Sequence, residues 1–189
     1  MDIILASNSP RRKEIMDKLK CGYRIISSDF DERNVPFNGD PAAYVKYLSY
    51  KKAEAVAATH PGSLILGMDT VVYLDGRVLN KPLDAKDAFA MMRTMSGRTH
   101  EVYTGFTILQ ASASLHISDF EITEVKFQDL SEAEITGYVE TGDYEGKAGG
   151  YAVQGEAGIF VEWIKGDFYN VVGMPLNRIY RELKGIKVL

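Results

Sequence analysis

Two neighbouring arginines, Arg11 and Arg12, stand at the expected start of the first helix, close behind a short apolar strand over 3–5. Ser9 is a typical N-cap residue, and Pro10 suits the first helical turn, where its missing N–H costs nothing. Arginines in that turn oppose the rule, because a helix N-terminus carries partial positive charge and prefers carboxylates. Amide donors, hydroxyls and guanidinium groups gathered there indicate a bound anion. The alternative, a solvated arginine pair on a surface helix, would be favoured for this motif alone.

A single acid, Asp69, interrupts the apolar run 64–72, which otherwise suits a buried strand. An ionised carboxylate in such a place is costly unless a metal, a cation or hydrogen-bond donors compensate its charge. One interpretation is therefore a buried functional carboxylate. The other is an aspartate at a strand end, bonded to nearby amides, and the local sequence favours neither.

Two lysines could add positive charge to such a site. Lys52 falls in register with Val45 and Leu48 on the apolar stripe of an expected helix. Lys81 precedes Pro82, which restricts the lysine backbone to an extended conformation. A lysine that snorkels from a partly buried face, and a lysine on a surface loop, are the respective alternatives.

Acids that could bind a metal lie in the loop 29–32, which ends at Glu32. Magnesium is usually held by one or two carboxylates together with phosphate oxygens. A solvated acidic loop is the more common meaning of such a run. The three histidines show no paired spacing typical of metal ligands.

A glycine-rich segment, 142–158, presents Gln154 near its end. Its first part resembles a P-loop, but the glycines are one residue too close together. Ala148 also stands where the magnesium-binding Ser or Thr is needed. We therefore expect a flexible or closely approached loop there and not a P-loop.

The composition is that of an ordinary globular protein: 46% of the 189 residues are hydrophobic and 25% are charged. The length predicts one domain over 1–189. A formal net charge of −4 argues against nonspecific binding to a nucleic acid polymer. No apolar stretch approaches the roughly 20 residues that span a bilayer, so no membrane partner is expected. The single cysteine excludes an internal disulfide, and the absence of a signal-peptide pattern predicts a cytoplasmic location.

Helices and strands are expected to alternate along the chain. Helices are predicted over 11–19, from 41 to about 59, between Asp84 and Gly97, after the capping box at Ser131, and from Pro175 onward. Strands are predicted over 3–5, 23–27, 64–74, 99–109, 115–126 and 159–164, and a turn at 165–167 connects the last one to the apolar segment 168–172. Hairpins occur beside interleaved helices, so we predict an α/β fold with a mixed sheet flanked by helices.

Six short motifs follow one another along nearly the whole chain. They are Leu5-Ala6-Ser7-x-Ser9-Pro10-Arg11-Arg12, Gly67-x-Asp69-Thr70-Val71, Lys81-Pro82-x-Asp84, Ser96-Gly97-x-x-His100, Lys147-Ala148-Gly149-x-Tyr151-x-x-Gln154-Gly155 and Val172-Gly173-x-Pro175-Leu176. Each motif alone is weak, but the ordered set is specific. In this order the motifs resemble the Maf family of nucleoside triphosphate pyrophosphatases.

The resemblance implies a fold similar to that of the inosine triphosphate pyrophosphatases, with a cleft between two lobes. It also implies hydrolysis of a nucleoside triphosphate to the monophosphate and pyrophosphate with a divalent cation, magnesium or manganese. The positions that match the family's phosphate-handling residues are Ser9, Arg11, Arg12, Lys52 and Lys81. Asp69 matches the proposed proton acceptor, and Glu32 matches an acid associated with metal and catalysis, so both are expected metal ligands.

Base specificity is associated in this family with the positions of Arg11, Thr70 and Gln154. The branch that acts on dTTP and UTP carries Arg, Thr and Gln there. The branch that prefers 7-methyl-GTP has Trp after the Ser-Pro pair and Glu in place of the Gln. The resemblance therefore implies pyrimidine nucleotides as substrates, modified ones included, and a role in cleansing the nucleotide pool.

Two positions depart from the family pattern. Met68 stands where Ala is usual, and its bulk could shift the neighbouring carboxylate or narrow the pocket. Gly146 replaces the acid of the usual Asp-Lys-Ala-Gly, and Glu145 could compensate for it.

Two other functional classes remain open from the sequence. One is a nucleotide-binding regulator of septum formation and cell division without essential catalysis, and the other is a phosphate-sensing module. Both predict binding without release of pyrophosphate, whereas an enzyme explains why Asp69 and Glu32 accompany the cations. Relatives often dimerise, so a homodimer is a further expectation.

Overall fold

The computed structural model describes residues 2–189, without the side chain of Arg33. The strands are β1 (Ile3–Leu5), β2 (Arg24–Ile25), β3 (Leu64–Leu74), β4 (Arg77–Leu79), β5 (Thr99–Gln110), β6 (Leu115–Phe127) and β7 (Val161–Lys165). Within the described residues they form one seven-stranded sheet in the order β2-β1-β3-β5-β6-β7, with β4 paired to β3. β1 is parallel to β2 and β3, and the other pairs are antiparallel. The predicted mixed sheet is confirmed.

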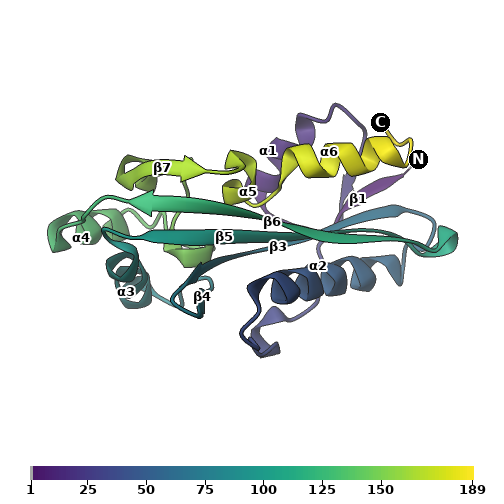
Figure 1. Cartoon of the computed structure of the whole chain (residues 1–189). Coiled ribbons are helices and arrows are strands. Elements are labelled where there is room, and N and C mark those ends of the chain that lie inside the picture. Colours follow the sequence, from purple (N-terminus) through teal and green to yellow (C-terminus); the bar gives the residue numbers. More distant parts are fainter. Residues whose placement is uncertain (1) are drawn as a thin grey trace.

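Helices cover both faces of this sheet. They are α1 (Pro10–Asp17), α2 (Pro41–Ala57), α3 (Ala85–Met95), α4 (Glu132–Glu140), α5 (Phe168–Val172) and α6 (Leu176–Gly185). α2 packs along one face of β3 and β5, while α1, α5 and α6 lie on the other (Figure 1). None of the helices in the described part of the chain is both long enough and apolar enough to cross a membrane.

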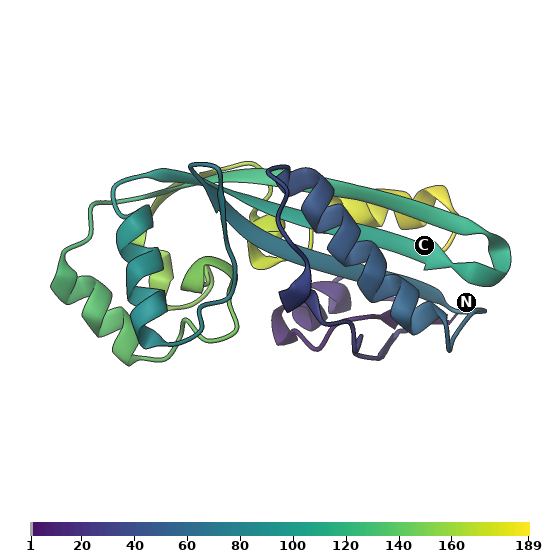
Figure 2. The same cartoon turned by 90° about the horizontal axis from the view of Figure 1, so that it is seen from below.

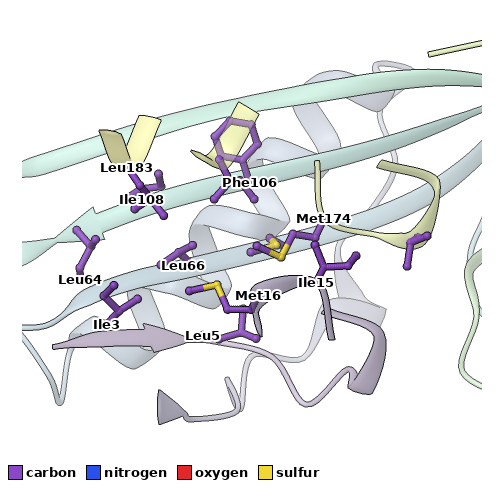
Figure 3. Packing of buried hydrophobic residues seen from close by; sticks show 13 residues of the cluster. Ile3, Leu5, Ile15, Met16, Leu64, Leu66, Phe106, Ile108, Met174 and Leu183 are labelled. Carbon is purple, nitrogen blue, oxygen red and sulfur yellow. The ribbon is translucent and has the colours of Figure 1, made fainter. Parts of the chain in front are cut away.

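Two lobes share the long strands β3, β5 and β6 (Figure 2). The first lobe carries β1, β2, α1, α2 and α6, and the second carries α3, α4 and β7. The core of the first lobe lies between the sheet, α1 and α6 and includes Met16, Leu66 and Phe106 (Figure 3). A second core around Met92 and Phe127 fills the other lobe. This arrangement confirms the predicted pair of lobes.

The segment 168–172, for which the sequence predicts no helix, forms α5. Asp167 begins it as N-cap, because its side chain accepts from Tyr169 N at 2.8 Å. Gly173 ends it with a φ of 112°, a backbone conformation that favours glycine. The predicted strand 159–164 begins later, at Val161, because residues 156–160 form a 3₁₀ helix.

β3 is only partly paired along one of its edges. β1 pairs with Leu64–Leu66 and β4 with Val72–Leu74, whereas β5 covers the opposite edge from Ile65 to Tyr73. Between β1 and β4, the described strands leave residues 67–71 without a partner on the first edge. Asp69 lies at the centre of this gap.

Close packing of α2 against the sheet depends on Gly67 in β3. A Cβ at Gly67 would lie 2.3 Å from Ser49 O and 2.8 Å from Ala53 N. Such distances would force the helix away from the strand. The glycine thus lets α2 approach β3 two residues before Asp69, which places Lys52 over the gap.

Candidate active site

A cleft of about 1030 Å³ lies at the gap in the sheet and receives side chains from both lobes. The structure brings together every residue that the sequence singles out for this function. All nine line the cleft: Ser9, Arg11, Arg12, Glu32, Lys52, Asp69, Thr70, Lys81 and Gln154. The guanidinium pair and the mid-strand aspartate, 57 and 58 positions apart in sequence, therefore share one cavity.

The N-terminus of α1 forms one end of the cleft wall. Ser9 is its N-cap, and the Ser9 side chain accepts from Arg12 N at 3.4 Å. Ser9 N in turn donates to Ser7 Oγ at 3.2 Å. The first turn of α1 carries no acidic residue, so the partial positive charge of the helix end faces the cleft uncompensated by its own side chains.

Asp69 lies in the middle of β3 and is only 6% exposed, so its placement at a strand end is wrong. Its charge is compensated by a lysine: Lys52 Nζ donates to Asp69 Oδ1 at 2.5 Å. The same ammonium pairs with Glu32, and Lys81 Nζ donates to Glu32 Oε1 at 2.6 Å. Two carboxylates and two ammonium groups thus form a chain of ion pairs in the order Asp69, Lys52, Glu32 and Lys81.

The pKa values of the two carboxyl groups in this chain of ion pairs are shifted in opposite directions. Burial raises the pKa of Asp69, against the opposing effect of Lys52. Burial also acts on Glu32, but the charges and hydrogen bonds of Lys52 and Lys81 outweigh it and lower the pKa of that carboxyl. Carboxylates separated in this way are typical of active sites in which one group exchanges a proton while the other stays ionised.

Arg12 is tied to the cleft wall by all three of its guanidinium nitrogens. Nε donates to Gly173 O at 2.8 Å, and Nη2 donates to Thr70 Oγ1 at 3.1 Å. Nη1 donates to Met68 O at 3.1 Å and to Ser7 Oγ at 3.2 Å. This one side chain therefore joins the β1–α1 loop, β3 and the end of α5.

Thr70 and Gln154 take different positions in the cleft. The Thr70 hydroxyl lies against the wall, where it accepts from Arg12 and contacts Thr104 Oγ1 at 3.0 Å. Gln154 is exposed on the loop from the second lobe that borders the cleft. Its amide is therefore open to a ligand.

Lys147, to which the sequence assigns no role, also lines the cleft. Its side chain is 13% exposed, and its Nζ donates to Asp143 Oδ1 at 3.0 Å. The lysine of the fifth motif was the available signal, because it lies in the same glycine-rich segment as Gln154.

The two departures from the family pattern have different surroundings. Met68 is fully buried in the first core with Leu5 and Phe106, on the side of β3 opposite to the Asp69 side chain. Its bulk is therefore absorbed by the core. Gly146 and Glu145 both line the cleft, so a carboxylate is present there one position earlier than in the usual motif.

Together, the fold and the site define an α/β protein with an interlobe cleft in which cations alternate with carboxylates. A comparison with known families identifies it further: the family described as Maf-like protein matches residues 2–186. The chain belongs to the Maf family.

Several bacterial relatives match nearly the full length of this chain. A protein of Clostridium acetobutylicum named dTTP/UTP pyrophosphatase is 43% identical over 197 residues, which cover all of this chain and 99% of the relative. Proteins of the same name are 42% identical in Clostridium perfringens, over 100% of this chain and 98% of theirs, and 45% identical in Clostridium botulinum, over 94% and 93%.

Two solved structures resemble the chain more distantly. The Staphylococcus aureus Ham1 protein is 12% identical with a TM-score of 0.49, over 68% of this chain and 73% of that one. A nucleoside-triphosphatase described as a dITP/XTP pyrophosphatase, from Mycobacterium abscessus, is 14% identical with a TM-score of 0.42, over 69% and 76%.

Proposed function

We propose that this protein hydrolyses the pyrimidine nucleoside triphosphates dTTP and UTP to the monophosphate and pyrophosphate. The relatives that match its full length carry the name of this activity. The observation in the structure that best supports it is the buried Asp69, which lies in the sheet gap and accepts a hydrogen bond from Lys52 at the wall of the cleft. A binding module without catalysis has no need of a carboxylate whose pKa is raised by burial.

The triphosphate binds between the start of α1 and the two lysines. The N-terminus of α1, with its partial positive charge, and the side chains of Ser9 and Arg11 face the cleft from one side. Lys52 and Lys81 face it from the other, each within hydrogen-bond distance of a carboxylate. These groups neutralise the phosphate oxygens, which is the main requirement for transfer at phosphorus.

A divalent cation, magnesium or manganese, fits the donor chemistry of this site. Asp69 and Glu32 already direct oxygens at one positive charge, the ammonium of Lys52. Within residues 2–189, no group of three or more His, Cys, Asp or Glu side chains is arranged to hold a metal alone. Magnesium is commonly bound by one or two carboxylates and substrate phosphates, so Asp69 and Glu32 would hold it together with the triphosphate. Such an ion stabilises negative charge on phosphate oxygens and on the pyrophosphate leaving group.

Asp69 accepts the proton in the hydrolytic step. Water attacks the α-phosphorus, a new P–O bond forms, and the bond from the α-phosphorus to the bridging oxygen breaks. Pyrophosphate leaves with the bonding electron pair, and the proton of the water passes to the Asp69 carboxylate. The raised pKa of this group makes it a stronger base than an ordinary aspartate.

The base is recognised by Gln154, on the loop of the second lobe that borders the cleft. Its amide both donates and accepts, as the imide edge of uracil or thymine requires. Arg11 and Thr70 complete this specificity set from the first lobe. The homodimer and the cytoplasmic location stay predictions from the sequence.

A panel of nucleoside triphosphates tests the proposal. The purified chain is incubated with dTTP, UTP, dGTP or 7-methyl-GTP in the presence of magnesium, manganese or a chelator, and monophosphate and pyrophosphate are measured. We expect equimolar products, fastest with dTTP and UTP, and no turnover with the chelator. Nucleotide binding without pyrophosphate release would favour the regulator over the enzyme.

A further inference from the structure

The open edge of β3 would leave backbone carbonyls unpaired beside Asp69. At the last residue paired with β1, Leu66 O accepts from Ala6 N at 2.9 Å. Alternate residues of a strand direct their carbonyls to the same edge, so Met68 O is the next one along. A buried carbonyl without a partner is costly, and here the missing strand is replaced by a side chain: Arg12 Nη1 donates to Met68 O at 3.1 Å.

We propose that Arg12 is a positioning residue: it supplies the hydrogen bond that a neighbouring strand would make to β3, and it thereby fixes the backbone position of Asp69. This inference rests on the proposed function, since the step that Asp69 performs is the one that suffers when its backbone shifts. It differs from the assignment by family resemblance, in which Arg12 handles phosphate.

The other bonds of Arg12 support this role. Its Nη2 donates to the Thr70 hydroxyl on the other side of Asp69, so the carbonyl before the aspartate and the side chain after it are both bonded to one planar group. Its Nε is anchored to Gly173 O, at the end of α5. A Cβ at Gly173 would lie 3.2 Å from Thr70 Oγ1 and 3.6 Å from Arg12 Nε, so the space behind the guanidinium is closely filled.

Arg178 provides a matched control. Its guanidinium also reaches two fixed acceptors, the carboxylates of Asp119 and Glu121, but it does not belong to the lining of the cleft. Lysine keeps the charge of arginine but has no planar fork with which to reach several fixed acceptors at once. Replacement by lysine at the two positions therefore tests whether the fork is needed at the wall of the cleft in particular.

The experiment compares Arg12→Lys with Arg178→Lys and the wild-type chain. We measure kcat and KM with dTTP, the Kd of pyrophosphate by calorimetry, and Tm. A misplacement of about 1 Å can cost about 10²-fold in rate. We expect Arg12→Lys to lose at least about tenfold in kcat, with KM and the pyrophosphate Kd within about threefold of wild type. Arg178→Lys should keep kcat within about threefold, since its charge remains and its side chain lies outside the cleft.

The proposal is overturned if Arg12→Lys keeps its kcat, or if its pyrophosphate affinity falls as much as its kcat does. If Arg12→Lys does not fold, Ser7→Ala replaces it, because this change removes one acceptor of the same guanidinium. A lower kcat at unchanged pyrophosphate Kd then supports the proposal, and an unchanged kcat overturns it.

If the wild-type chain releases no pyrophosphate, the proposed function fails. A normal pyrophosphate Kd with a lowered Tm in Arg12→Lys would still place Arg12 in the framework, and a weakened Kd with a normal Tm would make it a phosphate ligand.

Discussion

The first lobe buries charges at the wall of the cleft, whereas the second lobe buries a neutral pair, His100 and Tyr151, within its core. Asp69 stays in the interior because Lys52 and Arg12 lie beside it. In the described chain, His100 is bonded to a neutral group: its Nε2 lies 2.7 Å from the Tyr151 hydroxyl, and its Nδ1 has no hydrogen-bond partner there. Burial accordingly lowers the pKa of His100 to about 4.

The contrast separates two uses of a buried polar group. A histidine that serves only to pack in the core can be neutral, and the folded protein then avoids the free-energy cost of burying a charge. A carboxylate that must be available for chemistry is kept beside cations instead, at the expense of desolvating several charges together. Carboxylates that stay beside cations at the cleft, while a buried histidine on the neighbouring strand β5 is neutral, thus distinguish the active site from the rest of the interior.

Removal of the Asp69 charge should produce the largest effect. Asp69→Asn keeps the shape of the side chain but removes the proton acceptor, and general-base catalysis is worth about 10²–10⁴-fold. We expect kcat with dTTP to fall by at least about 10²-fold while Tm is maintained, because Lys52 keeps Glu32 as its partner. Steady-state kinetics and thermal unfolding measure the two quantities.

Asp119→Asn is the matched control for this change. Asp119 also pairs with a cation, Arg178, but it does not belong to the lining of the cleft. Its variant should keep wild-type kcat. Near-normal turnover of Asp69→Asn would mean that Asp69 is not the base, and the charged residues of the cleft would then serve only to bind the nucleotide.

The neutral pair of the second lobe should make folding sensitive to acid. His100 is protonated in the unfolded chain below its ordinary pKa of 6.5 but stays neutral in the folded chain down to about 4. The unfolded state therefore binds more protons in this window, so stability rises with pH through it and is lost as the pH falls. The full loss between pH 6.5 and 4 is about 3 kcal/mol.

Urea unfolding between pH 4 and 8 measures this contribution by difference. His100→Gln keeps a group that can bond to the Tyr151 hydroxyl but removes the titration, so its free energy of unfolding should fall less steeply toward acid than that of the wild type. His116→Gln, at an exposed histidine, should follow the wild-type curve. Parallel curves for wild type and His100→Gln would mean that His100 does not carry the acid sensitivity.

Much of the fold follows from local patterns, and the site follows from them only in part. The run 64–74 is β3 as predicted, because a mostly apolar run rich in β-formers toward its end and the following Asp75-Gly76 turn are local signals. The sequence does not predict the helix α5, because it is five residues long and depends on an aspartate cap and a glycine end. Such short elements carry almost no periodicity.

The role of Arg12 shows what the sequence leaves out of the site. Its type and its position at a helix start indicate a bound anion, so the sequence predicts that Arg12 is an anion-binding residue. Its acceptors, however, lie 56 and 161 residues away at Met68 and Gly173, and the gap that it fills exists only once β1 and β4 have paired with β3. No local sequence pattern predicts that a carbonyl of β3 lacks a neighbouring strand and is bonded by Arg12 instead.

Loss of the Gln154 side chain should have the smallest effect and should change selectivity more than rate. Gln154 belongs to the second lobe and is neutral, so its contribution is one or two hydrogen bonds to the base, each worth about 1 kcal/mol net. We expect Gln154→Ala to reduce the preference for dTTP over dGTP, measured as the ratio of kcat/KM, by about tenfold, with kcat for dTTP little changed. Gln110→Ala is the control, since Gln110 donates to Gly62 O and is not among the residues that line the cleft. An unchanged ratio in Gln154→Ala would assign base selection to the first lobe, with Arg11. The proposal that the second lobe selects the base would then be wrong.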